Sequence, residues 1–267
     1  MLGVELRIAS DDGRVLYDAY SDLVRDLQQL VSDVDRFVEA PGDRLTWGVT
    51  HQHHPGHLTV KAEPLDGAAD PVATQRLQRV ASAVLAGAAR LGEESGIPDF
   101  FTDESVTLLG RAAGRRQAPG IQGLQLVAMN GVVQSVAVLD ANVERNATAS
   151  VAAGTSSMGS IEGLLDTLSM RPKPRAAVFD ARTRRAVRVQ ADDALLLRLH
   201  PLFGQKVLVG GVIMRNARGQ AVRIRADTVE LLPEGVPQTR LAELIGIAPG
   251  WTGGRSAADV LDELRGD

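Results

Sequence analysis

Hydrophobic residues in the first 150 positions recur with two different periods, which together predict an α+β domain. VELRIAS (residues 4–10) and RVLYDAY (14–20) flank a DDG turn, and this pattern predicts a β-hairpin. Ser21 then fits a helix N-cap, because apolar residues follow it at helical spacing. These residues are Leu23, Leu27, Leu30, Val31, Val34 and Val38. The chain is therefore expected to begin with a strand pair and a long helix.

The rest of this first domain predicts further hairpins and helices. Residues 45–65 alternate around a Pro-Gly pair, which favours a second hairpin. Residues 71–91 and 102–110 have helical spacing, and a proline opens the first of these helices. Residues 121–139 form two apolar runs around an Asn-Gly pair, which is a strong signal for a hairpin turn.

A boundary between two domains follows this region. NATASVAAGTSS (residues 146–157) is small and polar and has no periodicity, so we interpret it as containing a linker. We place that linker at residues 149–157. The first domain then spans residues 1–148 and the second spans residues 158–233.

The second domain predicts the order strand, strand, strand, helix, strand, strand. The strands lie within residues 157–170, 175–191 and 206–233, and the helix lies within residues 191–203. Five strands with one helix between the third and the fourth is the order of an OB-fold, a small β-barrel. The expected fold class is thus α+β: an N-terminal α+β domain, an OB-fold-like five-stranded β-barrel with one helix, and a helical C-terminal tail.

The tail, residues 234–267, begins with a proline- and glycine-rich connector. Ser256 fits the N-cap of a short helix, and Trp251 precedes it across a Thr-Gly-Gly hinge. The apolar face of this helix is predicted to hold Val260, Leu261 and Leu264. An amphipathic helix with an aromatic anchor is typical of a ligand for a partner's groove. The alternative is that the tail docks on the chain's own first domain.

Composition excludes several classes of protein and site. The chain has 267 residues, of which 44% are hydrophobic and 23% charged, as is usual for a folded protein. It has no cysteine, which excludes disulfides, thiolate metal sites and a cysteine nucleophile. Neither a bilayer-length apolar run nor a secretion signal is recognisable, so we expect a cytoplasmic protein without a membrane partner.

The net charge of −4 is unevenly distributed. Residues 1–154 hold 13 basic and 20 acidic residues (−7), residues 155–232 hold 13 and 7 (+6), and the remainder holds 3 and 6 (−3). A basic barrel suggests a polyanion or an acidic protein surface as its partner. The candidates for nucleic-acid binding are Arg182, Arg184, Arg185, Arg188, Arg223 and Arg225. Single-strand binding also needs aromatic platforms, whereas Phe179 and Phe203 stand at expected core positions.

Metal and catalytic motifs are weak in this sequence. HQHHPGH holds four of the five histidines, and imidazole suits zinc, nickel and copper, which makes His51, His53 and His57 weak metal candidates. No carboxylate lies near in sequence to orient their rings, so we interpret this stretch as a solvated hairpin end. No phosphate loop, nucleophile elbow or paired metal motif is present. We therefore expect no catalytic residues, no enzyme activity and no cofactor.

Several segments resemble an uncharacterised family of bacterial proteins that are encoded beside PIN-domain proteins. These segments are GSIEGLLDTLS, FDARTRRAVRV, KVLVGGVIMRNARGQAVRIRADTVELLP and IGIAPGWTGGRSAADVLDELRG. They cover most of the chain from Met158 onward. The tail also resembles the end of antitoxins of PIN-domain ribonuclease toxins, in which a W/L-T-G-G-x-S stretch leads into a short helix. Arg255 stands where an aliphatic residue is more usual.

The resemblance implies that the chain neutralises a PIN-domain ribonuclease, whose carboxylates surround magnesium in an open groove. Trp251 and the apolar face of the tail helix would anchor the tail beside that groove. Arg255 or Arg265 would then enter among the acids, since guanidinium binds carboxylate in a bidentate fork.

Two other hypotheses stay open at the level of sequence. The first is a nucleic-acid-binding protein that acts through the basic barrel, with its tail docked in cis. The second is a structural subunit of a larger bacterial defence assembly. The sequence has no helix-turn-helix or zinc-finger pattern, so operator binding would have to use the barrel. A homo-oligomer is also open.

Overall fold

The computed structural model describes most of the first 232 residues. The described residues are 2–10, 14–38, 45–54, 56–65, 71–130, 132–152, 154–169, 175–180 and 182–232. Residues 1–232 form one compact unit. The predicted helical tail lies entirely outside the described residues. Within them the chain has five α-helices and two five-stranded sheets, so its architecture is α+β.

The first sheet is antiparallel throughout, with the strand order β2-β3-β1-β4-β5. Its strands are β1 (Leu2–Ala9), β2 (Trp47–His54), β3 (His57–Pro64), β4 (Gly123–Asn130) and β5 (Val132–Val138). The predicted hairpins β2–β3 and β4–β5 are confirmed, and β1 lies between them. The domain is thus built from two hairpins joined through a central strand.

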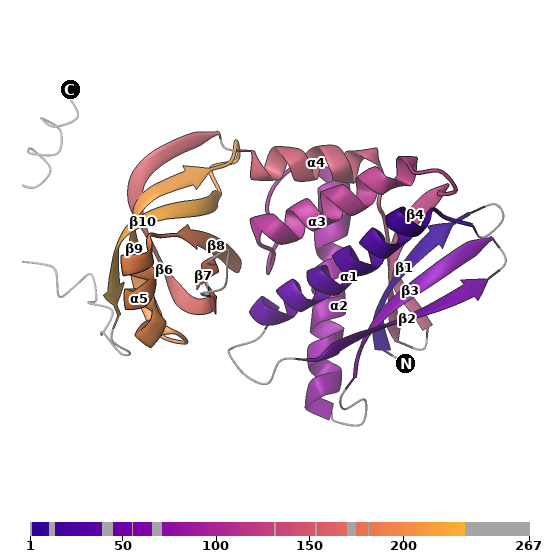
Figure 1. Ribbon diagram of the computed structural model, residues 1–267, viewed down its shortest axis with the longest axis horizontal. Helices are drawn as coiled ribbons and strands as arrows, with labels where there is room; N and C mark the ends of the chain where they lie inside the picture. Colours follow the sequence, from indigo (N-terminus) through magenta and orange to yellow (C-terminus); the bar gives the residue numbers. More distant parts are fainter. Residues whose placement is uncertain are drawn as a thin grey trace, which may run out of the picture. The chain divides into compact units, whose positions relative to one another are not determined.

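Four helices pack with this sheet. They are α1 (Tyr17–Val38), α2 (Pro71–Glu93), α3 (Asp103–Gly114) and α4 (Ala141–Val151), and a 3-10 turn at Arg115–Gln117 follows α3. Val4, Leu6 and Ile8 of β1 are almost fully buried in the core that these helices share. Figure 1 shows the helices gathered on one side of the sheet. Glu5 and Arg7 alternate with the core residues and form an ion pair on the opposite face.

The predicted strand at residues 14–20 is wrong, because helix α1 begins at Tyr17. Ala19 and Tyr20 pack against the domain core and extend the apolar stripe of α1 toward its N-terminus, and Val15 packs against the same core just before the helix. Ser21 is therefore inside the helix rather than its N-cap. Its hydroxyl donates to the carbonyl oxygen of Asp18, at 3.1 Å.

Regular structure also occupies most of the stretch that was predicted as a linker. Helix α4 runs to Val151, and strand β6 begins at Thr155. The side chain of Asp140 caps α4 by accepting from the backbone N–H groups of Asn142 and Val143. The small residues of this stretch let α4 lie close to α3, where an added Cβ at Gly110 would stand 2.7 Å from the Cβ of Ala147. Close helix packing, rather than chain flexibility, explains the small side chains.

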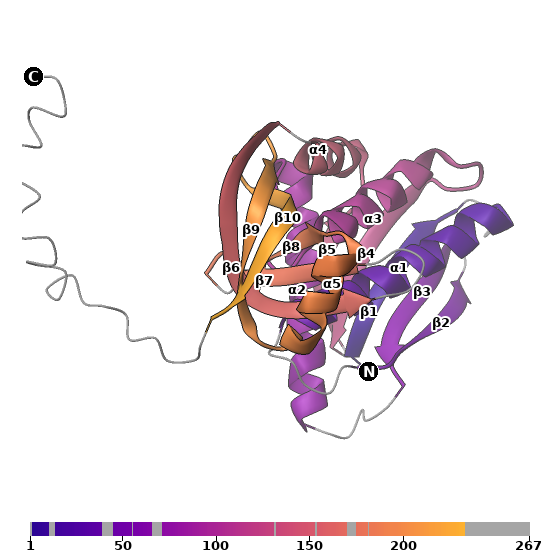
Figure 2. The ribbon, with the colours of Figure 1, turned by 60° about the vertical axis from the view of Figure 1, so that its left-hand side comes forward.

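The second sheet closes into a barrel with the strand order β10-β8-β7-β6-β9 (Figure 2). Its elements are β6 (Thr155–Ser169), β7 (Arg175–Asp180), β8 (Arg185–Gln190), α5 (Asp193–Leu199), β9 (Lys206–Arg215) and β10 (Ala221–Leu231), with a 3-10 turn at His200–Leu202. The predicted order of five strands and one helix is confirmed. Strands β8 and β10 pair in parallel, and every other pairing is antiparallel.

Alternate residues of the barrel strands fill its interior. Val207 and Val209 of β9 and Leu165 of β6 have no exposed surface. Gly211 has φ 156°, and a Cβ there would lie 2.1 Å from the carbonyl oxygen of Arg225. Only glycine allows β9 and β10 to approach so closely at this bend. Among the described residues, none of the helices has the length and apolar character needed to cross a membrane.

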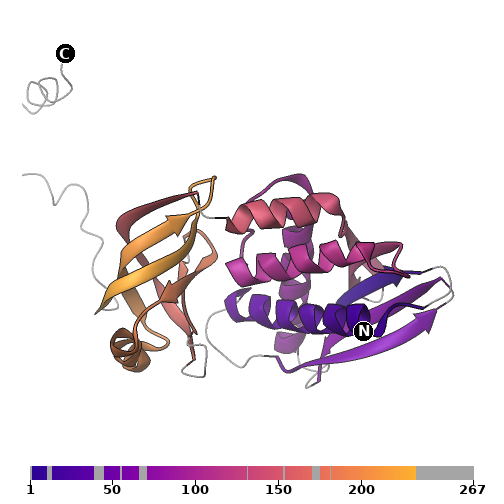
Figure 3. The ribbon, with the colours of Figure 1, turned by 45° about the horizontal axis from the view of Figure 1, so that its top comes forward.

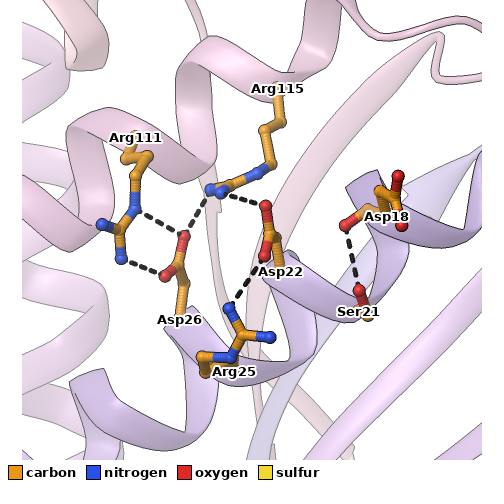
Figure 4. Close-up of polar contacts among 7 residues, drawn as sticks. All are labelled: Asp18, Ser21, Asp22, Arg25, Asp26, Arg111 and Arg115. Atoms are coloured by element: carbon orange, nitrogen blue, oxygen red, sulfur yellow. Dashed lines mark hydrogen bonds and ion pairs between the residues drawn. The ribbon is translucent and has the colours of Figure 1, made fainter.

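A network of ion pairs joins α3 to α1 (Figure 4). Arg111 and Arg115 both donate to the carboxylate of Asp26, which is 3% exposed. Arg115 also binds Asp22 at 2.8 Å, and Arg25 binds Asp22 at 3.0 Å. The hydrogen bond from Arg115 lowers the pKa of Asp22. The network fixes α3 beside α1, and Figure 3 shows α1, α3 and α4 side by side.

Replacement of Asp26 by alanine should destabilise the fold, because it leaves two arginines without their shared buried carboxylate. A fully buried pair costs about 3–5 kcal/mol when it is broken, and we expect about 2–3 kcal/mol here because water reaches Arg111. Urea unfolding followed by circular dichroism measures the loss. Asp18→Ala, on the exposed first turn of the same helix, is the control and should cost less than about 1 kcal/mol. Equal losses in the two variants would contradict a role for the network.

Candidate functional site

The barrel holds the segment between α2 and α3 through two of its turns. The backbone N–H of Ile97 donates to Gln220 Oε1 at 2.8 Å, and Arg185 Nε donates to the carbonyl oxygen of Ile97 at 3.0 Å. Arg218, in the turn between β9 and β10, forms a 2.7 Å ion pair with Glu94. Side chains of the β9–β10 turn and of the start of β8 thus satisfy the backbone of the same short segment.

Asn216 extends this junction to the end of α4. Its side chain is buried and donates to the carbonyl oxygen of Ser150 and to Gln220 Oε1, both at 2.9 Å. The backbone N–H of Gly96 donates to the hydroxyl of Ser150 at 2.6 Å. The segment between α2 and α3, the end of α4 and the β9–β10 turn therefore share one hydrogen-bond network.

An aromatic stack continues the junction over the outer face of β7 and β8. The rings of Phe37 and Phe179 lie 5.6 Å apart with an interplanar angle of 16°. Phe179 also stacks with Phe100 at 6.4 Å and 13°. Ala177 and Ala186 are buried beneath these rings. Phe179 was expected in the barrel core, but it packs outside the barrel against residues of the first domain. Phe203, which had the same expectation, is 49% exposed.

The six arginines predicted for nucleic-acid binding separate into two groups. Arg185 holds Ile97, and burial lowers its pKa. Arg188 lies 3.0 Å from Asp103 and 3.6 Å from Glu104. Arg223 is the register partner of Arg188 on β10. Arg185 and Arg188 therefore contact the first domain, and Arg223 lies next to Arg188. The other three, Arg182, Arg184 and Arg225, are exposed.

Asp103 is the buried acid of this junction. Burial raises the pKa of its carboxyl, and the charges of Arg188 and Arg223 oppose that rise. It stands at the first residue of α3, where the helix N-terminus favours a negative charge. The positive charges of Arg188 and Arg223 therefore compensate the negative charge of a buried carboxyl at the start of α3.

Two strained residues meet at the rim of the junction. Phe100 has φ 66° and Arg184 has φ 55°, and they are the two non-glycine residues with positive φ in the described part of the chain. The backbone N–H of Phe100 donates to the carbonyl oxygen of Arg184 at 2.7 Å. A left-handed backbone costs a residue with a Cβ about 1–2 kcal/mol. Strain of this kind is concentrated at functional sites, where the surrounding structure enforces it.

A cleft of about 1230 Å³ opens beside this strained pair. Its walls come from the end of α1, from strands β6 to β9 and from both turns that grip the first domain. The basic lining residues are Arg36, Arg182, Arg184, Arg185, Lys206, Arg215 and Arg218, and the acidic ones are Glu162, Asp166 and Asp180. In a chain with net charge −4, this cleft has an excess of four positive charges.

The cations of the cleft differ in how strongly they are bound. Arg218 is held by Glu94, as described above, and Arg185 by a carbonyl oxygen. Arg182 is 86% exposed and 3.9 Å from Asp180, and Arg184 is 63% exposed and 3.8 Å from Asp99. Both separations are near the limit for an ion pair. Arg36, in the last turn of α1, has no ion-pair or hydrogen-bond partner among the described residues.

The histidines of β2 and β3 lie on both faces of the sheet. His51 and His53 are two residues apart on β2, so they share one face. His57 pairs with His54 instead, and these two rings stack at 4.8 Å. The predicted candidates His51, His53 and His57 therefore do not converge. In the part of the chain that the structure describes, no group of three His, Asp or Glu side chains could hold a metal ion.

The predicted partner-binding residues lie outside the described residues. They are Trp251, Arg255, Val260, Leu261, Leu264 and Arg265. Their assignment stays a prediction. The first domain also contributes Arg36, Phe37 and Phe100 to the cleft, and these residues were not predicted from the sequence. Phe100 belongs to the Asp-Phe-Phe sequence between α2 and α3, which is a visible signal in a chain that is 3% aromatic.

No known protein family, curated protein or solved structure matches this chain.

The stability that Glu94 contributes should depend on pH. Hydrogen bonds from Arg218 and Arg90 hold the pKa of Glu94 below its ordinary value of 4.5. A carboxyl whose pKa is lower in the folded state stabilises the fold above its unfolded pKa, and this contribution is lost as the pH falls through the folded value. The difference in unfolding free energy between the native chain and Glu94→Gln should be constant from about pH 7 to pH 5 and shrink below about pH 4.5.

Urea unfolding over this pH range measures the difference. Glu93→Gln changes the exposed neighbouring residue, the last of α2, and is the control. A difference for Glu94→Gln that stays constant down to the lowest pH would contradict the ion pair with Arg218.

Replacement of Arg184 by glycine should stabilise the fold. Glycine adopts φ 55° without a Cβ penalty, and the lost side chain is exposed and 3.8 Å from its nearest carboxylate. We expect an increase of about 0.5–1 kcal/mol in the free energy of unfolding. Arg182→Gly, in the same turn but without a left-handed backbone, should be neutral or lower it by up to about 1 kcal/mol. Destabilisation by Arg184→Gly would show that the arginine side chain, rather than its backbone, matters for folding.

Proposed function

We propose that this chain is an antitoxin-like, non-enzymatic protein that binds and neutralises a PIN-domain ribonuclease through residues 233–267. The observation that carries the proposal is the sequence of these residues, which follow the compact unit of residues 1–232 along the chain. Their sequence combines an aromatic anchor with an amphipathic acidic helix, which suits a partner's groove. The resemblance of this segment to the tails of such antitoxins supports the same partner.

The contacts that the barrel makes with the first domain also support this proposal. Its strand order and the parallel pairing of β8 with β10 are those of an OB-fold, in which strands 2 and 3 and the loop between strands 4 and 5 bind ligands. The corresponding elements here are β7, β8 and the β9–β10 turn. All three contact the first domain of the same chain, so the barrel acts as an internal clamp. The elements of the barrel that would bind a ligand are therefore in contact within the chain, which favours the segment of residues 233–267 as the partner-binding part.

The chemistry of neutralisation would depend on an apolar anchor and on a cation. Burial of Trp251 and of the three aliphatic residues of the tail helix offers about 6–10 kcal/mol, at about 1.5–3 kcal/mol for each large side chain. Ordering the segment on its partner removes about 2–5 kcal/mol of this. Arg255 or Arg265 would supply further affinity by pairing with the partner's magnesium-binding carboxylates. The magnesium belongs to the ribonuclease, and this chain needs no cofactor for the role.

The proposal predicts that Trp251→Ala abolishes neutralisation. The experiment co-expresses the full chain with the PIN-domain protein that the resemblance implies is encoded beside it, and it measures both co-purification and ribonuclease activity. We expect the native chain to inhibit the nuclease, and we expect Trp251→Ala to weaken the complex by a factor of ten or more, since about 1.4 kcal/mol is tenfold. Arg255→Ala and Arg265→Ala then identify the blocking cation.

Phe203→Ala is the matched control, because it removes an exposed aromatic side chain from the barrel. It should leave inhibition unchanged. Inhibition that survives Trp251→Ala, or that is absent from the native chain, would overturn the proposal.

A further inference from the structure

We propose that the cleft between the first domain and the barrel binds a nucleoside phosphate, either free or as part of a single strand. In this proposal the phosphates contact Arg36, Arg182 and Arg184, and the base stacks on Phe100. The site is distinct from the tail, and its function does not depend on a ribonuclease partner. The cleft shares residues of β7, β8 and the β9–β10 turn with the contact between the barrel and the first domain.

Some cations of the cleft are not paired with groups of the first domain. Arg185, Arg188 and Arg218 are occupied by groups of the first domain. Arg182 and Arg184 project from the β7–β8 turn, and the carboxylates nearest to them are 3.9 and 3.8 Å away. Arg36 comes from a different domain and lines the same cleft. Guanidinium groups from two domains can therefore converge on one phosphate-bearing ligand, and their planar fork suits phosphate oxygens.

The second argument comes from the aromatic stack. Phe179 stacks with both Phe37 and Phe100, so Phe100 ends the row of rings. Phe37 is buried, whereas Phe100 is half-buried and lines the cleft. A planar base can extend such a row, because every base offers a π-face to an aromatic side chain. An acidic peptide would use the arginines but would have no need of the ring.

The third argument comes from backbone strain. Phe100 and Arg184 are hydrogen-bonded to each other, both have a left-handed backbone, and both line the cleft. The ring that would stack with the base and an arginine that would bind the phosphate are thus held rigidly together. Glycine or asparagine would adopt this backbone at position 184 with less strain, so the presence of arginine calls for a reason other than the fold.

The test uses the full chain and two fluorescent probes, a labelled adenosine diphosphate and a labelled oligouridylate, with anisotropy as the readout. We expect saturable binding of at least one probe. Arg182→Glu combined with Arg184→Glu should weaken it at least tenfold. The matched control combines Arg145→Glu with Arg225→Glu, which makes the same change in net charge at two exposed arginines outside the cleft. It should change affinity less than twofold.

The salt dependence and two further variants separate the contributions. If three phosphates are neutralised, oligouridylate affinity should fall about 20-fold between about 50 and 200 mM salt, from a slope of about 0.7 per phosphate for a single strand. Phe100→Leu should weaken binding about tenfold without a change in that slope. Arg184→Gly should weaken binding although it stabilises the fold, which a merely structural role would not produce.

The outcomes distinguish the source of the ligand and the failure of the idea. Binding of both probes with similar affinity assigns a free nucleotide, and binding of the oligouridylate alone assigns a single strand. Absence of binding for both probes at about 50 mM salt overturns the proposal, as does an equal loss in the two double-charge variants. Stronger competition by polyglutamate than by unlabelled nucleotide would assign an acidic peptide instead. Trp251→Ala should leave all of these results unchanged, so the inference and the proposed function fail independently.

Discussion

The structure of residues 1–232 depends on how the short segment between α2 and α3 satisfies its backbone. Gly96, Ile97 and Pro98 are buried, and a buried peptide group without a partner is costly. The segment has no helix or strand of its own that would pair its backbone. Ser150 accepts from Gly96, Gln220 accepts from Ile97, and Arg185 donates to Ile97. The barrel thus supplies both hydrogen-bonding partners of Ile97, α4 supplies that of Gly96, and this requirement ties the two domains together.

This constraint determines which surfaces of the barrel stay accessible. The β9–β10 turn contacts the segment, and the aromatic rings stacked on Phe179 cover the outer face of β7 and β8. The β7–β8 turn has to reach past the segment, and its residue Arg184 takes a left-handed backbone to bond Phe100. The arginine-lined cleft lies beside that turn. The contacts that hold the segment and the cleft beside them therefore both follow from the way in which the barrel packs against the first domain.

Local pattern predicted the elements whose folding is decided locally. The barrel order followed from alternating apolar residues and from turns rich in Asp, Asn and Gly, and the structure confirms it. The start of α1 was misassigned because Val15, Ala19 and Tyr20 fit a strand in a short window and a helix only when read with Leu23 and Leu27. Helix α4 was missed because its small residues serve packing against α3, which sequence periodicity does not reveal.

The candidate site was harder to predict than the fold, because its residues come from distant parts of the chain. Arg188 and Asp103 are 85 positions apart in sequence, yet they lie 3.0 Å apart across the junction. The sequence analysis counted Arg185 and Arg188 among six candidates for nucleic-acid binding. Their internal partners are visible only once the barrel is docked. Arg36 and Phe100 were not considered as candidates, because they belong to the acidic first domain.

Charge segregation along the sequence therefore has two components. The acidic first domain and the basic barrel meet through Glu94 with Arg218 and through Asp103 with Arg188, so part of the asymmetry is used within the chain. The Asp103–Arg188 pair is partly buried and is screened less by salt than exposed charges are, whereas the side chains of Glu94 and Arg218 are each 41% exposed. What remains for an external ligand is the excess that lines the cleft, chiefly Arg36, Arg182 and Arg184. A polyanion would therefore be recognised at the junction, where barrel and first domain each contribute cations, and not on the barrel alone.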